Sequence, residues 1–316
     1  MEKRILGRTG FSVSTLGVGG HTYPVGNGPE DFATHDQRAA LIKHLVEAGV
    51  NYFDTTWMNE VELLADSIQR AAITAPLTVS LQYVDGISDS NWRGKLRGEI
   101  ENRLKVMGYS RAPLFIMGVG NHRPGLAEIR AAATMLNEFK AEGLIENVGV
   151  SCHDFPAFDS IATVIEEDDT IDYMMIRYNW KFPLASERLF PTARAKNVGL
   201  VAMKALCWDC GYGDWGRRIS VFEPIEAAGR EPRLENLNAA QRSLLWCLQS
   251  THTSVPSINA MWEAEQLIQA VNAGEAAIET DDFPDYLDRL HNAESLGALA
   301  EHAESAAIRQ RAAALL

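Results

Sequence analysis

Cysteine and long apolar runs are both scarce in this sequence. The four cysteines are too few and too scattered to form a disulfide framework. No run of about 18 apolar residues occurs, and the first residues lack the apolar segment that is typical of a signal peptide. We therefore expect a cytoplasmic protein that does not span a membrane.

Positive charge is also in short supply. The chain has 29 Lys and Arg residues against 42 Asp and Glu residues, which gives a formal net charge of -13. Such a surface repels phosphate backbones and anionic lipid unless a local basic patch intervenes, and no long run of Lys or Arg is present. We therefore expect a small-molecule ligand or substrate, and neither nucleic acid nor membrane as a partner.

The residues that are present indicate a globular protein with a regular architecture. Hydrophobic residues make up 46% of the 316 residues, and apolar strand-like segments alternate with amphipathic helical ones. This alternation predicts parallel βα repeats. The predicted strands comprise residues of about 15–18, 51–54, 77–82, 114–119, 147–151, 173–179, 199–206 and 253–258.

Eight such strands predict an α/β fold, a (β/α)8 TIM barrel, in one domain that covers residues 1–316. A small N-terminal β-hairpin around Arg8, Thr9 and Gly10 precedes the barrel, which extends over about residues 12–275. Within it, the helix at 126–143 places Ile129, Leu136 and Phe139 at helical spacing. A helical extension follows from about residue 280 to residue 316.

Candidate catalytic groups follow the predicted strands. Asp54 ends the second strand, and the chemistry of such barrels gathers at the carboxyl ends of their strands. His21 follows the first strand, His122 the fourth and His153 the fifth, and histidine titrates near neutral pH. Taken alone, Asp54 could be a general base, a metal ligand or a solvated carboxylate.

Several motifs in the expected order resemble those of aldo-keto reductases. They are L-G-R-T-G at 6–10, N-Y-F-D-T at 51–55, F-K-A-E-G-L-I-E-N-V-G-V-S at 139–151, R-Y-N at 177–179 and A-Q-x-x-L-x-W at 240–246. The resemblance implies the barrel fold and reduction of a carbonyl group by NAD(P)H. It also implies four catalytic residues: a tyrosine acid, a lysine that lowers the pKa of this tyrosine, an aspartate that holds the lysine, and a histidine that orients the carbonyl.

Only one of these four residues is present at the matching position, Asp54. The tyrosine position falls on Met58 or Asn59, the lysine position on Gln82, and the histidine position on Met117 or Gly118. Asn and Gln side chains cannot act as acids at neutral pH. We therefore predict a divergent NAD(P)-linked oxidoreductase with a non-standard active site. Its candidate catalytic residues are Asp54, His122, His21, Asn59 and Gln82.

The resemblance also suggests where a cofactor would bind. Its candidate contacts are Ser151, Cys152, Tyr178, Asn179 and Lys204, at the ends of the fifth, sixth and seventh strands. NAD is compatible with the sequence. NADP is disfavoured, because no Lys or Arg lies between Arg242 and Arg289, and Glu263 and Glu265 would face its 2′-phosphate.

Other functions stay open at this point. Cys207 and Cys210 form a C-x-x-C motif, but a second local pair is lacking, so a metal site is disfavoured. Aromatic residues on several loops predict a lined pocket: Trp57, Trp208, Tyr212 and Trp215. The alternatives are a non-redox lyase, isomerase or hydrolase that uses the barrel mouth, and a catalytically silent binding protein.

Overall fold

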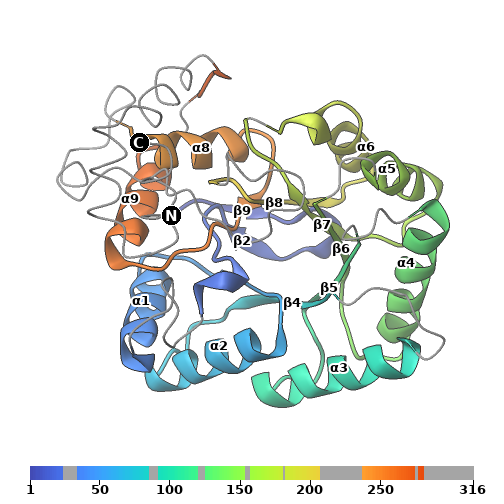
Figure 1. The fold of residues 1–316 in the computed structure, drawn as a ribbon, viewed down its shortest axis with the longest axis horizontal. Coiled ribbons are helices and arrows are strands. Elements are labelled where there is room, and N and C mark those ends of the chain that lie inside the picture. Colours follow the sequence, from blue (N-terminus) through green and yellow to red (C-terminus); the bar gives the residue numbers. More distant parts are fainter. Residues whose placement is uncertain are drawn as a thin grey trace, which may run out of the picture.

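The computed structural model is an α/β barrel with a curled parallel sheet at its centre (Figure 1). It describes residues 1–23, 34–84, 92–119, 125–153, 157–180, 182–206, 237–274 and 277–280. Neighbouring strands pair in chain order from β3 to β9. The strands are β3 (Tyr52–Thr55), β4 (Thr78–Tyr83), β5 (Leu114–Gly118), β6 (Val148–Cys152), β7 (Tyr173–Arg177), β8 (Gly199–Met203) and β9 (Thr253–Ser254).

Helices surround this sheet, and the predicted alternation of strands and helices is confirmed (Figure 1). Helix α4 is an example: its residues Ile129, Leu136 and Phe139 recur at helical spacing and are fully buried against the sheet. The helices are α1 (His35–Glu47), α2 (Met58–Arg70), α3 (Trp92–Met107), α4 (Leu126–Ala141), α5 (Phe158–Glu167), α6 (Leu189–Ala195), α8 (Ala239–Leu248) and α9 (Met261–Asn272).

The predicted first strand is not regular, so the sheet of the described residues has seven regular strands and not eight. Residues 15–18 instead form two single parallel bridges, Leu16 with Ser254 and Val18 with Phe53, and these bridges close the barrel. The predicted strand 253–258 is also shortened to β9, because Pro256 has no N–H group to donate to a strand ladder. We call residues 15–19 the seam.

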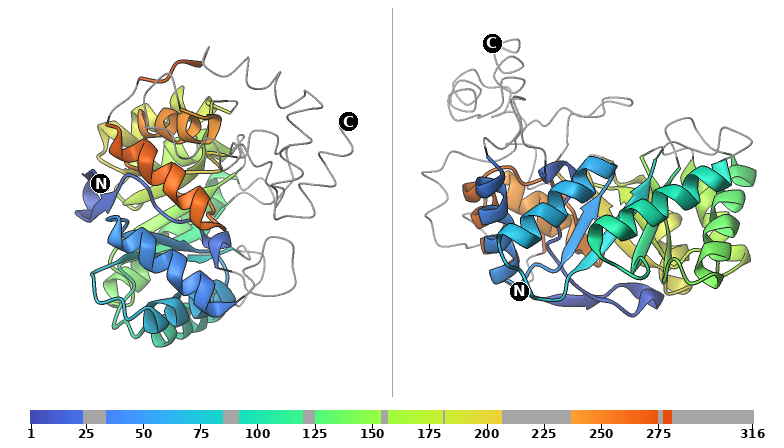
Figure 2. Two further views of the ribbon diagram at one scale, coloured as in Figure 1. Left: turned by 90° about the vertical axis from the view of Figure 1, so that its left-hand side faces the viewer. Right: turned by 90° about the horizontal axis from the view of Figure 1, so that it is seen from below.

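The predicted N-terminal hairpin is confirmed. Strand β1 (Lys3–Ile5) pairs antiparallel with β2 (Ser12–Ser14), and the 3-10 helix η1 (Gly7–Thr9) lies between them. The backbone N–H of Arg8 donates to the carbonyl of Asn197, just before β8 begins. The hairpin therefore covers the end of the barrel at which the strands start (Figure 2).

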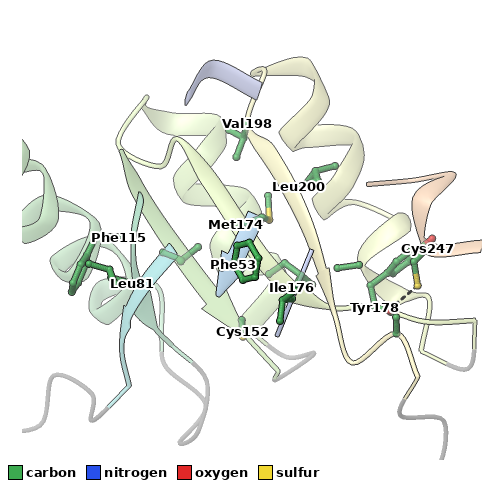
Figure 3. Packing of buried hydrophobic residues seen from close by; sticks show 14 of the residues in the cluster. Phe53, Leu81, Phe115, Cys152, Met174, Ile176, Tyr178, Val198, Leu200 and Cys247 are labelled. Carbon is green, nitrogen blue, oxygen red and sulfur yellow. Dashed lines mark hydrogen bonds between the residues drawn. The ribbon is translucent and has the colours of Figure 1, made fainter. Parts of the chain in front are cut away.

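Two apolar layers fill the molecule. One lies inside the barrel and includes Tyr52, Ile116 and Met175, whereas the other lies between the strands and the helices. Figure 3 shows part of this outer core around Phe53 and Ile176. Because successive side chains of a strand point to opposite faces, residues two positions after an inward residue also point inward.

Several sequence predictions lie outside the described residues. These are His122, Cys207, Cys210, Trp208, Tyr212, Trp215 and the helical extension after residue 280. Within the described segments, no helix has the length and apolar character needed to cross a membrane.

Candidate active site at the carboxyl ends of the strands

Asp54 lies inside the barrel at the carboxyl end of β3 and is only 3% exposed. Both of its carboxylate oxygens accept hydrogen bonds from Nε2 of Gln82, at 2.8 and 2.9 Å. The Oγ of Ser151 donates in turn to Oε1 of Gln82, at 3.2 Å. Three strands, β3, β4 and β6, thus contribute to one chain of polar side chains across the barrel. The sequence predicted all three residues as members of the site.

Burial raises the pKa of Asp54 to about 7. The hydrogen bond from Gln82 opposes this rise in pKa, and the nearby charge of Glu60 adds to it. The backbone N–H groups of Gly20 and Thr55 also favour the carboxylate. At neutral pH the Asp54 carboxyl group is therefore divided between its acid and its carboxylate form, as proton transfer requires.

A second buried carboxylate, Glu60, lies in the first turn of α2 and is 1% exposed. Its Oε2 accepts hydrogen bonds from the backbone N–H groups of Thr56 at 2.6 Å and Trp57 at 3.3 Å. Its Oε1 lies 2.8 Å from Nδ1 of His21. Glu60 was not predicted from the sequence, because a glutamate at this position of a helix is a common capping residue.

Gly20 allows this arrangement because it has no side chain. A Cβ atom at residue 20 would lie 2.5 Å from Oε2 of Glu60, so any other amino acid there would require the Glu60 carboxylate to move. His21 follows in the short 3-10 helix η2 (Gly20–Thr22), and its ring stacks on that of Trp57 with 5.0 Å between the centroids. The segment after the seam therefore contacts Glu60 through His21, and its Gly20 N–H lies close enough to Asp54 to lower the pKa of that carboxyl group.

Basic residues follow three neighbouring strands on another side of the mouth. His153 follows β6, Arg177 ends β7 and Lys204 follows β8. Burial, with the charges of Lys204, Arg177 and His21, lowers the pKa of His153 well below its usual value. Lys204 has a φ of 61°, a left-handed conformation that is unfavourable for lysine. Its carbonyl accepts a hydrogen bond of 2.9 Å from the side chain of Asn179.

Three of the predicted cofactor contacts are located in the barrel wall or the outer core. The ring of Tyr178 packs against Phe190 and Trp246, and its hydroxyl group donates to Oγ of Ser250 at 3.2 Å. Cys152 also belongs to the outer core, as Figure 3 shows. Asn179 is fully buried. The reason is strand alternation, which points Ser151 inward and Cys152 outward.

Asn59, one of the two residues that the sequence matches to the family's tyrosine, is exposed on α2, whereas the inward-facing side of the same turn is taken by Glu60. In the described part of the chain, no three His, Cys, Asp or Glu side chains are grouped so that they could hold a metal ion. Asp54, Gln82, Ser151, Glu60 and His21 therefore form the site that the geometry brings together.

Comparison with known proteins gives a consistent result. The model of the Aldo/keto reductase family matches residues 15–207. A search of curated proteins finds no significant match.

Solved structures resemble this one over most of its length. The aldo-keto reductase AKR11C1 from Bacillus halodurans, in its holo form, is 15% identical with a TM-score of 0.63, over 92% of this chain and 96% of that chain. The thermostable aldo-keto reductase Tm1743, in complex with the inhibitor epalrestat, is 19% identical with a TM-score of 0.64, over 90% and 100%. An aldo-keto reductase from Klebsiella pneumoniae in complex with NADPH is 16% identical with a TM-score of 0.63, over 92% and 95%.

Proposed function

Because the chain belongs to the aldo/keto reductase family, we propose that it is a divergent NAD(P)-linked oxidoreductase that reduces a small carbonyl compound. The observation that carries this proposal is Asp54, which occupies the family's aspartate position inside the mouth and has a pKa of about 7. A buried, titrating carboxyl group at the carboxyl ends of barrel strands is typical of a catalytic centre.

The chemistry of this site differs from that of the family. The family's lysine would stabilise a phenolate by its charge, whereas Gln82 contacts Asp54 as a neutral amide. Among the residues that the structure describes, Asp54 therefore bonds to an amide and to no ammonium group, and its pKa is raised toward neutrality. We propose that Asp54, Gln82 and Ser151 position the carbonyl compound and the nicotinamide amide at the mouth.

For the cofactor, we propose that NADH binds more tightly than NADPH. The family's contact with the 2′-phosphate lies near the start of α9, where this chain carries Glu263 and Glu265. Glu263 is 6% exposed, and its Oε2 already accepts a hydrogen bond of 2.7 Å from the N–H of Asn259. A phosphate dianion would compete with this carboxylate for the N–H groups at the start of the helix.

The proposed function is tested by titrating the protein with NADH and NADPH and following nicotinamide fluorescence and thermal unfolding. We expect binding of at least one nucleotide, tighter binding of NADH, and nucleotide oxidation with aldehydes or ketones. Ser151→Ala should weaken binding, while Tyr178→Phe should leave it unchanged, because Tyr178 packs in the outer core. Absence of binding by both nucleotides would overturn the proposal.

A second function, acid–base chemistry without hydride transfer, is supported by the proximity of two buried carboxylates and a histidine. The charge of Glu60 contributes to the raised pKa of Asp54, and His21 contacts Glu60. Such a set could move a proton next to a carbonyl group, as an isomerase or lyase does. Solvent deuterium that enters a carbonyl compound in the absence of nucleotide would favour this second function.

A further inference from the structure

We propose that His21, held by Glu60, is the proton donor of this site. The inference rests on the oxidoreductase function proposed above and names a residue for the step that the missing family tyrosine leaves open. It concerns a histidine of the first loop and a glutamate of α2, which lie 39 residues apart in the chain.

Tyrosines near Asp54 do not fill the role of the missing phenol. Tyr23 and Tyr52 are both fully buried. Burial, followed by the charge of Asp54, raises the pKa of each phenol above its usual value. A phenol with a raised pKa is a weak acid at neutral pH, so neither tyrosine is suited to donate a proton.

The contact between His21 and Glu60 has the geometry of an oriented acid. Glu60 is fixed by the N–H groups of Thr56 and Trp57, and its second oxygen lies 2.8 Å from Nδ1 of His21. A carboxylate only accepts hydrogen bonds, so Nδ1 carries the proton in this pair. Nε2 is therefore the atom left to exchange a proton with a substrate, as in other carboxylate–histidine pairs.

The position of His21 suits contact with a ligand. Its side chain is 38% exposed, while that of Glu60 is 1% exposed, so the pair combines an accessible ring with a buried carboxylate. Stacking on Trp57 restricts the ring further. The backbone N–H of the adjacent Gly20 lies close enough to Asp54 to lower the pKa of its carboxyl group, so His21 follows directly after a residue that lies beside Asp54.

In the proposed step, a bound reduced nicotinamide would supply hydride, with its two electrons, to the carbonyl carbon as the C=O π bond breaks. The carbonyl oxygen would take the proton from Nε2 of protonated His21, which becomes neutral imidazole, so that an alcohol and the oxidised nicotinamide result. His21 would then regain a proton from the solvent, which supplies the one proton that the overall reduction consumes, while Glu60 holds the ring through Nδ1.

Titratable groups on several elements lie near this pair. Glu60 on α2 contacts the imidazole, the charge of His21 acts on His153 after β6, and the charge of Glu60 acts on Asp54 of β3. A pH profile of the wild type alone would therefore combine several ionisations. The test uses substitutions of the pair and compares their profiles with that of the wild type.

The experiment measures NADH binding and turnover in His21→Gln, His21→Ala and Glu60→Gln. We expect His21→Gln to reduce kcat by about 100-fold or more, with nucleotide affinity changed by less than about twofold. Added imidazole should restore part of the turnover of His21→Ala. Glu60→Gln should reduce kcat less and should change the pH profile, since its amide cannot stabilise the imidazolium to the same extent.

His35→Gln serves as the matched control. His35 also contacts a carboxylate through Nδ1, that of Asp66 at 2.8 Å, and is comparably exposed, but this pair links α1 to α2 on the outside of the barrel. We expect His35→Gln to keep wild-type turnover.

Three outcomes would overturn the inference. Wild-type turnover in His21→Gln with intact NADH binding would remove His21 as the donor and leave the oxidoreductase function standing. A loss of turnover that follows loss of nucleotide affinity or of the folded state, without rescue of His21→Ala by imidazole, would assign His21 a structural role. Absence of nucleotide binding by the wild type would instead overturn the proposed function, and the donor role with it.

Discussion

Two buried aspartates lie at opposite ends of the barrel, and they are stabilised in different ways. Asp172, just before β7 at the end where the strands start, is 4% exposed and accepts hydrogen bonds from Nζ of Lys140 at 2.6 Å and from the N–H of Val148 at 2.8 Å. Asp54, at the mouth, is 3% exposed, and its side-chain partner is the neutral amide of Gln82.

The difference shows how one barrel separates stability from chemistry. An ammonium group compensates the charge of Asp172, so this carboxylate contributes to the folded state at neutral pH. No cation of the described residues contributes to the pKa of Asp54, and burial raises this pKa to about 7, so the side chain destabilises the folded state once it is ionised. At neutral pH the ionised Asp54 therefore lowers the stability of the folded state, whereas the Asp172 carboxylate is compensated by Lys140.

Asp54→Asn should change stability most, and in a pH-dependent way. The folded-state pKa of Asp54 is raised from 3.8 to about 7, so folding favours the protonated form. Its contribution to stability is fully present below about pH 4 and is lost as the pH rises to about 7. We expect the advantage of Asp54→Asn over the wild type to grow by about 2–3 kcal/mol between pH 5 and pH 8, measured by urea unfolding. An advantage that does not vary with pH would contradict the raised pKa.

Lys140→Met should leave Asp172 without its ammonium partner, so that this buried carboxylate destabilises the folded state as Asp54 does. The buried Asp172 carboxylate would keep the Val148 N–H but lose its cation. Because Lys140 is 36% exposed, solvent already screens part of the pair, and we expect a loss of about 1–3 kcal/mol in urea unfolding at pH 8. Wild-type stability of Lys140→Met would show that the ammonium does not compensate the Asp172 charge.

Gln82→Lys is the reverse change, because it places an ammonium group beside Asp54 as Lys140 lies beside Asp172. An ammonium beside Asp54 favours the carboxylate and lowers its pKa. In the wild type, ionisation of Asp54 lowers the free energy of unfolding between pH 5 and pH 8. We expect this loss to be about 1–2 kcal/mol smaller in Gln82→Lys, measured by the same urea unfolding. An unchanged pH dependence would mean that the new ammonium does not reach Asp54.

Much of the fold could be predicted because it is encoded locally. The spacing of Ile129, Leu136 and Phe139 specifies the buried face of α4 without reference to the rest of the chain. The number of regular strands could not be predicted, because residues 15–18 form only isolated bridges, and such pairing depends on how distant segments meet.

The site was predictable only in part, for a similar reason. Asp54, Gln82 and Ser151 end strands, so strand order alone brings them together. The contact between His21 and Glu60 depends on the fit of a loop against the start of a helix, and no local pattern encodes it. Tyr178 packs in the outer core because it alternates with the inward residues Tyr173 and Met175, and an aromatic residue near a strand end does not by itself reveal which side it will face.

The seam has a consequence for how the molecule opens. Its amides from Gly17 to Gly19 bond to β9, to β3 and to Pro256, but through single bridges and not through a continuous ladder such as that between β7 and β8. Hydrogen exchange should therefore release these amides before those of the central strands. If these amides exchange first, the earliest local opening of the barrel frees the segment that carries His21. A substrate would then enter the barrel at the part of the sheet whose amides are least protected from exchange.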